Sequence, residues 1–248
     1  KCIKGICGQV DGSVIPGMVG LEAGQSSFGD VYAMFRRILE FPVREILPQT
    51  IGDKLSKEEI DNIVEKTCDK IIVKLTEEAE KIPVCESTMI ATDWINGRRT
   101  PDANQLLKGT IAGFTLGSNA PQVFRALVEA TAYGTKAIVD RFESEGIVID
   151  NVIGIGGIAL KSPFVMQTMC DVINKPIKVC NTDQACALGA AMFAATAAGI
   201  YEKVEDAIEN MNSGFSKEYI PQPENVKAYE DIYKKYLKLG QFTEKELF

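Results

Sequence analysis

The stretch Ile149-Asp-Asn-Val-Ile-Gly-Ile-Gly-Gly-Ile-Ala-Leu-Lys-Ser-Pro163 decides the fold class of this chain. A β-branched run at 152–155 contains the first of three glycines, at positions 154, 156 and 157, and Ser162-Pro163 then opens an amphipathic pattern. β-branched runs predict strands, and a serine followed by proline is typical of a helix start. The stretch therefore predicts a strand, a glycine corner and a helix in succession, as in α/β folds.

Two interpretations of this glycine corner remain open. Glycine has no side chain, so a flat ligand can lie against the backbone, and the free N–H groups of a helix start favour an anion. These properties predict a nucleotide site. Glycine at such a corner also allows close packing of the helix on the strand without any ligand.

The corner fits one nucleotide-binding pattern and departs from another. Gly154, Gly156 and Ala159 satisfy the dinucleotide fingerprint G-x-G-x-x-A, which keeps a Rossmann NAD-binding domain as an alternative. No acidic residue is clearly placed about 20 positions further on, where that fold holds the ribose. A P-loop would need glycines at the positions of Ile155 and Leu160, so that motif is absent.

Composition excludes several classes of function. The chain has 248 residues, of which 46% are hydrophobic and 25% charged, enough for one large domain with an elaboration. A net charge of -7 and a pI near 4.9 argue against general binding to nucleic acid or acidic lipid. The seven cysteines form no C-x-x-C pair, which predicts buried thiols in a reducing cytoplasm. Because histidine is absent, Ser-His-Asp and Cys-His nucleophiles are excluded.

The N-terminus and the longest apolar run predict a chain without a membrane anchor. The run 185–200 is alanine-rich and shorter than the about 20 residues that span a bilayer, so it predicts a buried helix. The first residues lack the pattern of a signal peptide and are expected to continue a strand.

Apolar spacing predicts the remaining elements. A hairpin is expected around Asp11-Gly12 and a second strand of the corner unit at 176–179. Four helices are expected. The first begins after Asp30, and the second runs from about 54 to 82 within a helical insertion at about 45–90. The third runs from 119 to about 145, and the fourth forms a C-terminal tail at about 224–248.

Two loops carry candidate binding side chains. The glycine-rich loop 20–30 contains Glu22, which could face a ligand or solvent. The loop 92–102 contains Arg98 and Arg99, which could clamp a phosphate or pair with the aspartates of the same loop. We expect the arginines to be structural.

Four segments together resemble the FGGY family of carbohydrate kinases, and three of them resemble its ribulokinase branch in particular. The three are Lys4-Gly-Ile-Cys-Gly-Gln-Val-Asp-Gly-Ser-Val-Ile-Pro-Gly17, Gly20-Leu-Glu-Ala-Gly-Gln-Ser-Ser-Phe-Gly-Asp30 and Asp93-Trp-Ile-Asn-Gly-Arg-Arg-Thr-Pro-Asp-Ala-Asn-Gln105. The fourth is Cys186-Ala-Leu-Gly-Ala-Ala-Met-Phe-Ala-Ala195. The resemblance covers nearly all of the chain and is weakest in the insertion and the tail.

The resemblance implies an α/β fold of the actin-like, ribonuclease-H-like ATPase type, a mixed sheet flanked by helices, with residues 1–248 as one C-terminal kinase domain. It implies transfer of the γ-phosphoryl group of ATP, with Mg²⁺, to L-ribulose in the cytoplasm, giving L-ribulose 5-phosphate for L-arabinose catabolism. It implies no nucleic-acid or membrane partner, and a homodimer is an expected assembly. In this family the catalytic aspartate and a phosphate loop precede the segment that matches Lys1. The chain is therefore expected to be the C-terminal part of a longer kinase, inactive alone and without catalytic or metal-binding residues.

The resemblance also implies roles for individual residues. Glu22 is the implied sugar-binding residue. The implied ATP-binding residues belong to the glycine corner and to the glycine-rich loop with its helix start: Gly156, Gly157, Ile158 and Lys161, and Gly24 and Gly29. A nucleotide-switch module of the actin or heat-shock-chaperone type is the second alternative, and Glu22 argues against it because a switch needs no sugar-facing carboxylate.

Overall fold

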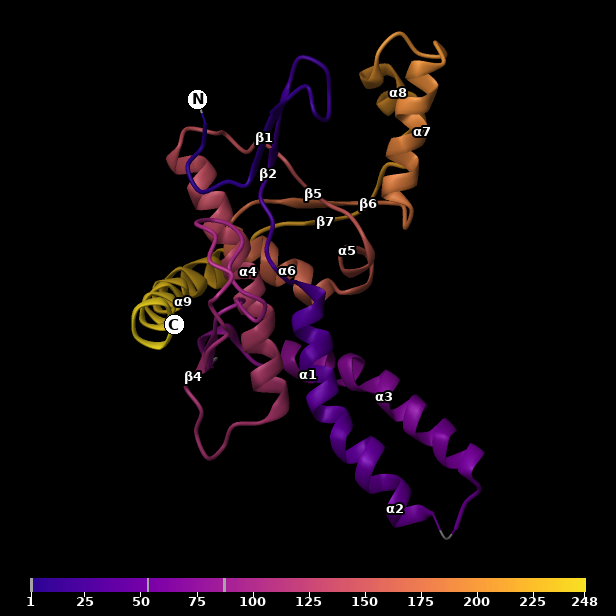
Figure 1. Ribbon diagram of the computed structural model, residues 1–248, viewed down its shortest axis with the longest axis vertical. Coiled ribbons are helices and arrows are strands. Elements are labelled where there is room, and N and C mark those ends of the chain that lie inside the picture. The colour runs from indigo at the N-terminus through magenta and orange to yellow at the C-terminus, as the bar shows by residue number, and fades with distance from the viewer. Residues whose placement is uncertain (1, 53, 87) are drawn as a thin grey trace. The chain divides into compact units, whose positions relative to one another are not determined.

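The computed structural model describes residues 2–52, 54–86 and 88–248. Their helices and strands, shown in Figure 1, divide into two units. One unit comprises Lys1–Gly24, Arg99–Ala103 and Thr135–Lys227, and the other comprises Gln25–Arg98, Asn104–Gly134 and Ala228–Phe248. We call them the first and the second unit and describe each by itself.

The glycine corner lies in the sheet of the first unit. β5 (Val152–Gly154) runs parallel to β6 (Ile177–Cys180), and β7 (Phe215–Tyr219) pairs with the other edge of β6 in the antiparallel direction. Parallel strands need a crossover, which here consists of α5 (Gly157–Lys161) and α6 (Pro163–Ile173). The predicted strand, corner and helix are confirmed, with α5 as an additional short helix. The mixed sheet with helices confirms the α/β fold class.

A hairpin begins the first unit. β1 (Gly8–Asp11) pairs antiparallel with β2 (Val19–Glu22), which confirms the predicted hairpin. The loop between them is longer than the two-residue turn that an Asp-Gly pair favours, and it closes through a hydrogen bond of 2.8 Å from the Gly12 N–H to the Met18 carbonyl. Gly12 has φ 65°, a left-handed conformation that explains why glycine occupies this position.

The alanine-rich helix α7 (Ala185–Ala197) is more exposed than the sequence predicts. It was expected to be buried, but Met192 and Ala195 are its buried residues and most of its other side chains are exposed. Small apolar residues surround the helix on all sides, so the pattern does not specify which side packs. Within the described part of the chain, α7 contacts α8 (Val204–Met211). No helix among the described residues has the length and hydropathy needed to cross a membrane.

The cysteines also depart in part from expectation. All seven are free thiols, but only Cys68 and Cys170 are buried. Burial raises the pKa of the Cys170 thiol to about 12, so this thiol is a packing group rather than a nucleophile.

A buried carboxylate joins α6 to the segment after β7. Asp171 is 1% exposed and accepts hydrogen bonds from the Gln222 N–H at 2.8 Å, from Asn225 Nδ2 at 2.9 Å and from Gln167 Nε2 at 2.8 Å. Gln167 Nε2 and Asn225 Nδ2 also donate to the Ile220 carbonyl at 3.0 Å and to Gln222 Oε1 at 2.9 Å, but only the carboxylate joins all three donors.

We therefore expect Asp171→Ala to lower the free energy of unfolding by about 3 kcal/mol, because it removes three hydrogen bonds to a buried carboxylate. Urea denaturation of the variant and of the exposed-site control Asp150→Ala measures this difference. A loss below about 0.5 kcal/mol, as expected for a surface site, would contradict the structural role.

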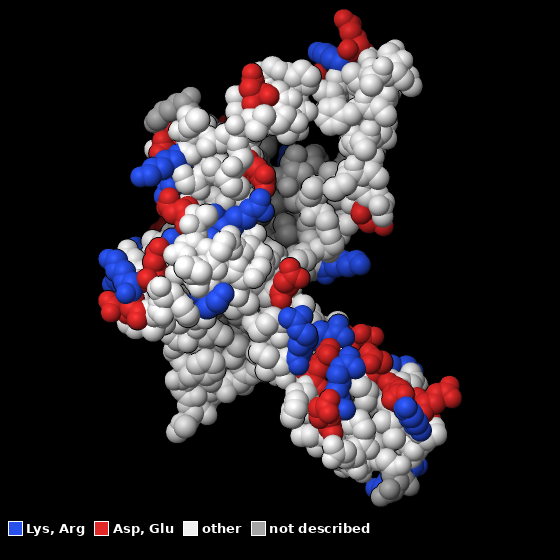
Figure 2. Space-filling model, viewed as in Figure 1, with Lys and Arg blue, Asp and Glu red and all other residues white. Residues whose placement is uncertain are grey.

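The second unit contains the charged helices. α1 (Gly29–Phe41) continues through a π-helical turn at Pro42–Ile46 into α2 (Leu47–Ile51), and α3 (Lys57–Glu80) follows. A capping box at Ser56 fixes the start of α3. Figure 2 shows side chains of both signs mixed over this region, in agreement with the charge-laced pattern of the sequence.

Further elements of the second unit are short. A 3₁₀ turn at Val84–Glu86 precedes β3 (Ile90–Ala91), which pairs antiparallel with β4 (Ile111–Ala112). The predicted long helix is α4 (Ala120–Ser144), and Asn119 caps it by accepting a hydrogen bond of 3.1 Å from the Gln122 N–H. Part of α4 belongs to each unit.

The predicted C-terminal helix is confirmed as α9 (Pro223–Phe242), which ends in a π-helical turn at Thr243–Leu247. Its tyrosines 229, 233 and 236 are buried around Tyr133 of α4, and the ring centroids of Tyr133 and Tyr236 lie 5.3 Å apart. This part of the helix therefore contributes to the core of the second unit.

A buried carboxyl connects this core to the loop after β3. Tyr236 Oη donates a hydrogen bond of 2.7 Å to Asp93 Oδ1, and Gln25 Nε2 donates one of 2.9 Å to Asp93 Oδ2. Burial raises the pKa of the Asp93 carboxyl above its ordinary 3.8, although both hydrogen bonds act in the opposite direction.

Stability should therefore depend on pH through Asp93. Because the pKa of Asp93 is higher in the folded than in the unfolded state, protonated Asp93 stabilises the folded state. This stabilisation is fully present below about pH 3.8 and is lost as the pH rises through the higher folded pKa. Asp93→Asn removes this titration. We expect the stability of the variant, relative to the parent protein, to increase from about pH 4 to about pH 8 in denaturant titrations. A difference that is constant over this range would contradict the raised pKa.

Candidate functional site

The structure gives a different account of why glycine occupies each of the three positions of the corner. A side chain at Gly154 would place its Cβ 3.0 Å from Met166 Cε and 3.4 Å from Ala159 Cβ, so this glycine serves packing. Gly156 has φ 88°, which few residues other than glycine adopt. A Cβ at Gly157 would meet no atom within 4 Å, and no positive φ requires glycine there. Packing therefore accounts for Gly154 and backbone conformation for Gly156, while neither reason accounts for Gly157.

The other residues predicted at the corner lie on α5. Ala159 is buried against the sheet side, Ile158 is half-buried, and Lys161 is exposed at the last residue of the helix. The exposed backbone of Gly156 and Gly157 precedes them directly. The corner is therefore an open backbone surface flanked by one apolar and one cationic side chain.

Glu22 stands at the end of β2 with its carboxylate in an ion pair. Arg99 Nη2 donates to Glu22 Oε1 at 2.5 Å. Cys7 lies beside the pair, and its Sγ donates to the Glu22 main-chain carbonyl at 3.2 Å. The pKa of the Cys7 thiol is lowered mainly by a hydrogen bond with Thr100, with smaller contributions that include the charge of Arg99.

Two predictions about the arginines have different outcomes. Arg98 forms two hydrogen bonds, of 2.8 and 2.9 Å, with the carboxylate of Glu244 and lies 4.8 Å from the centroid of the Trp94 ring, which supports a structural role. Both arginines were expected to pair with aspartates of their own loop, but Arg98 pairs with Glu244 and Arg99 pairs with Glu22. The sequence separation of 77 residues hides this contact from local pattern analysis.

The predicted glycine-rich loop is divided between the units. Gly24 belongs to the first unit, where a Cβ would lie 3.1 Å from Arg99 Nη1. Gly29 begins α1 in the second unit. Glu22 and Gly24 are thus brought together around Arg99, while Gly156, Gly157, Ile158 and Lys161 form a separate group at the corner.

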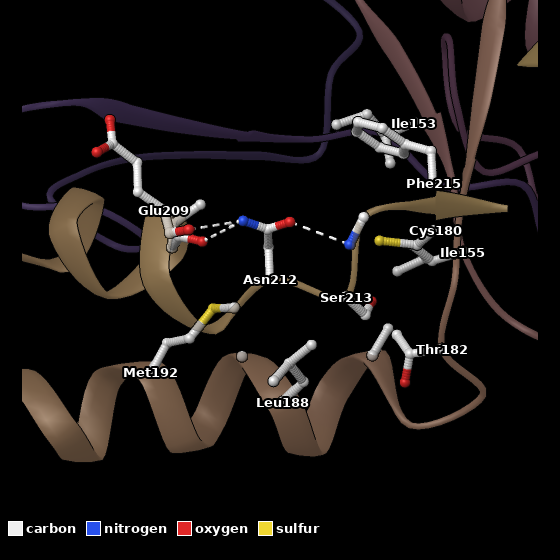
Figure 3. A pocket seen from close by; sticks show the side chains of 14 residues that line it. Ile153, Ile155, Cys180, Thr182, Leu188, Met192, Glu209, Asn212, Ser213 and Phe215 are labelled. Atoms are coloured by element: carbon white, nitrogen blue, oxygen red, sulfur yellow. Dashed lines mark hydrogen bonds between the residues drawn. The ribbon is translucent and has the colours of Figure 1, made fainter.

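Sequence analysis missed an apolar cavity of about 480 Å³ in the first unit. Figure 3 shows Ile153, Ile155 and Phe215 on one side of it and Leu188 and Met192 of α7 on the other. Asn212 links the end of α8 to the segment before β7, donating to the Ile208 and Glu209 carbonyls and accepting from the Gly214 N–H at 3.0 Å. Its volume lies in the range of small-molecule pockets. Ile153 and Ile155 flank Gly154 in sequence, but their β-branched pattern predicts a strand and gives no sign of a cavity.

No group of three or more histidine, cysteine, aspartate or glutamate residues that could hold a metal ion occurs in the part of the chain that the structure describes. Glu22, the carboxylate among the predicted site residues, is engaged by Arg99.

Comparison with known proteins identifies the family. The sequence profile described as "FGGY family of carbohydrate kinases, C-terminal domain" matches residues 1–198. The chain belongs to the FGGY family of carbohydrate kinases. A ribulokinase from Vibrio parahaemolyticus is 46% identical to this FGGY chain over 244 residues, covering 98% of the chain and 42% of the relative. A ribulokinase from Bacillus licheniformis is 36% identical over 250 residues, covering 99% and 42%. The chain thus spans less than half the length of these curated relatives.

Solved structures show the same fold. A xylulose kinase from Rhodospirillum rubrum matches with a TM-score of 0.67 and 19% identity, covering 90% of this FGGY chain and 40% of that chain. A glycerol kinase from Plasmodium falciparum, solved with ADP, matches with a TM-score of 0.56 and 24% identity, covering 67% and 33%. These likenesses confirm the predicted sugar-kinase fold of the actin-like ATPase type. They do not favour the Rossmann or the nucleotide-switch alternative.

Proposed function

We propose that this chain is the ATP-binding part of a kinase that transfers the γ-phosphoryl group of ATP to L-ribulose and forms L-ribulose 5-phosphate. The observation that carries the proposal is the 46% identity to a ribulokinase across 98% of the chain. That similarity extends over 244 of the 248 residues.

ATP is proposed to place its adenosine against Gly156 and Gly157. Support comes from the open space over Gly157 and from the exposed backbone of both glycines. A flat base can approach such a surface because no Cβ stands in the way. Ile158 would contribute apolar contact, and Lys161 would lie beside the base. Gly24 and Gly29 complete the proposed nucleotide-binding residues.

The sugar is proposed to bind Glu22. A carboxylate accepts hydrogen bonds from neighbouring hydroxyl groups, and such charge-assisted bonds are stronger than neutral ones. The resemblance assigns the aspartate that takes the proton from the sugar hydroxyl to a segment outside this chain. This chain's own contribution is therefore to hold the two substrates in place, which is a major part of phosphoryl-transfer catalysis.

Mg²⁺ is proposed as the metal that accompanies ATP and neutralises phosphoryl charge when bound. Its ligands are proposed to be the nucleotide and residues that the family resemblance places outside this chain. A cytoplasmic location and a homodimer belong to the same proposal.

The test is an ATP-dependent kinase assay on the purified full-length protein with L-ribulose, D-ribulose and D-xylulose. We expect ADP release that depends on L-ribulose, and a product of the mass of ribulose 5-phosphate. ATP binding without phosphorylation of any sugar would favour the nucleotide-switch alternative, and NAD binding would favour the Rossmann alternative. The 248-residue chain alone should not phosphorylate L-ribulose.

A further inference from the structure

The ion pair between Arg99 and Glu22 has an arrangement that stability alone does not explain. The side chains are 45% and 64% exposed, and ion pairs with this exposure contribute only about 0–1 kcal/mol. Arg99 engages Oε1 of the carboxylate, and among the described residues no hydrogen bond reaches Oε2. One oxygen is thus held while the other stays available.

Two glycines give this pair its space. Gly8 lies opposite Glu22 in the β1–β2 hairpin, and a Cβ there would stand 2.8 Å from Glu22 Cβ and 3.1 Å from Oε2. A Cβ at Gly24 would stand 3.1 Å from Arg99 Nη1 and 3.4 Å from its Cζ. Neither glycine has a positive φ, so their backbone conformations do not require glycine. At Gly8 the nearness of Glu22 Cβ leaves no room for a side chain, and at Gly24 a side chain would press on the guanidinium of Arg99.

We propose that Arg99 is a positioning residue for the sugar, which holds the carboxylate of Glu22 in one orientation with Gly8 and Gly24 leaving room for it. The inference rests on the proposed function. A fixed carboxylate accepts a hydroxyl hydrogen bond without first losing rotamer freedom, so positioning lowers the cost of binding. The guanidinium suits this role because its fork is rigid: Nη2 donates to the carboxylate while Nη1 lies on the side of Gly24.

The experiment measures KM for L-ribulose, KM for ATP and kcat of the full-length protein in four variants. Arg99→Ala should raise the KM for L-ribulose about 3- to 10-fold, with the KM for ATP and the melting temperature unchanged. Arg99→Lys should restore part of the loss because it keeps the charge without the fork. Gly8→Ala should raise the same KM by displacing Glu22. Arg141→Ala is the control for loss of an arginine–carboxylate pair in the first unit, since Arg141 pairs with Asp102 at 2.7 Å, and it should leave the KM for L-ribulose unchanged.

A double variant separates positioning from an independent effect. In the Glu22→Ala background, Arg99→Ala should cause no further rise in the KM for L-ribulose, because its target is gone. Additive effects, or an unchanged KM in Arg99→Ala while Glu22→Ala raises it, would overturn the positioning role and leave the proposed function intact. If the parent protein phosphorylates no L-ribulose, the proposed function itself fails.

Discussion

Glu22→Ala is expected to raise the KM for L-ribulose about 10- to 100-fold in the full-length protein, while the KM for ATP stays unchanged. A hydrogen bond to a charged group contributes about 1.5–3 kcal/mol, and this range corresponds to the expected change in KM. The folded state should be little affected, because the side chain is 64% exposed and its partner Arg99 is 45% exposed. Steady-state kinetics with each substrate varied in turn measures both constants.

The matched control is Glu218→Ala, which removes an exposed glutamate from β7 in the same unit. It should change neither KM. A KM for L-ribulose that Glu22→Ala leaves within about twofold of the parent value would mean that Glu22 faces solvent, as an isolated loop carboxylate usually does.

Gly157→Val is expected to weaken ATP binding at least about tenfold without lowering stability. The structure has no atom within 4 Å of a Cβ at this position, so the chain itself tolerates a side chain. A bound adenosine would occupy that space, and inserting bulk into a filled contact costs about 1–3 kcal/mol. Isothermal titration with ATP gives the affinity, and thermal unfolding gives the stability.

Gly117→Val provides the control for bulk at an open glycine. Gly117 also has no positive φ, and a Cβ there would meet only Thr115 Oγ1 at 3.9 Å. This variant should bind ATP like the parent protein. Unaltered ATP affinity in Gly157→Val would remove the glycine corner from the nucleotide site, since nothing in the chain would then distinguish the two glycines.

Much of the fold could be predicted because the elements follow strong local patterns. The helix from Lys57 to Glu80 has a capping box and a charged face, and α4 has a cap at Asn119, so their starts are visible in the sequence. The β-branched strand β5 and the helix after Ser162-Pro163 were equally clear. The packing of α7 could not be predicted, because a helix that is apolar on all sides does not show which side it buries.

The candidate site was predictable only where a single segment forms it. The glycine corner is continuous in sequence, but local pattern could not separate a packing glycine at 154 from an open one at 157, since this depends on Met166 from the following helix. The Glu22–Arg99 pair joins residues 77 positions apart, and the roles of Gly8 and Gly24 follow only from that pair. Such contacts are set by tertiary structure and leave no periodic signal.

Hydrogen–deuterium exchange of the full-length protein tests the central claim most directly, because it locates both substrates on the chain in one measurement. The account predicts that a non-hydrolysable ATP analogue slows amide exchange at residues 156–161, and that L-ribulose slows exchange around Glu22. Unchanged exchange at 156–161 with saturating nucleotide would contradict the assignment of the glycine corner to ATP.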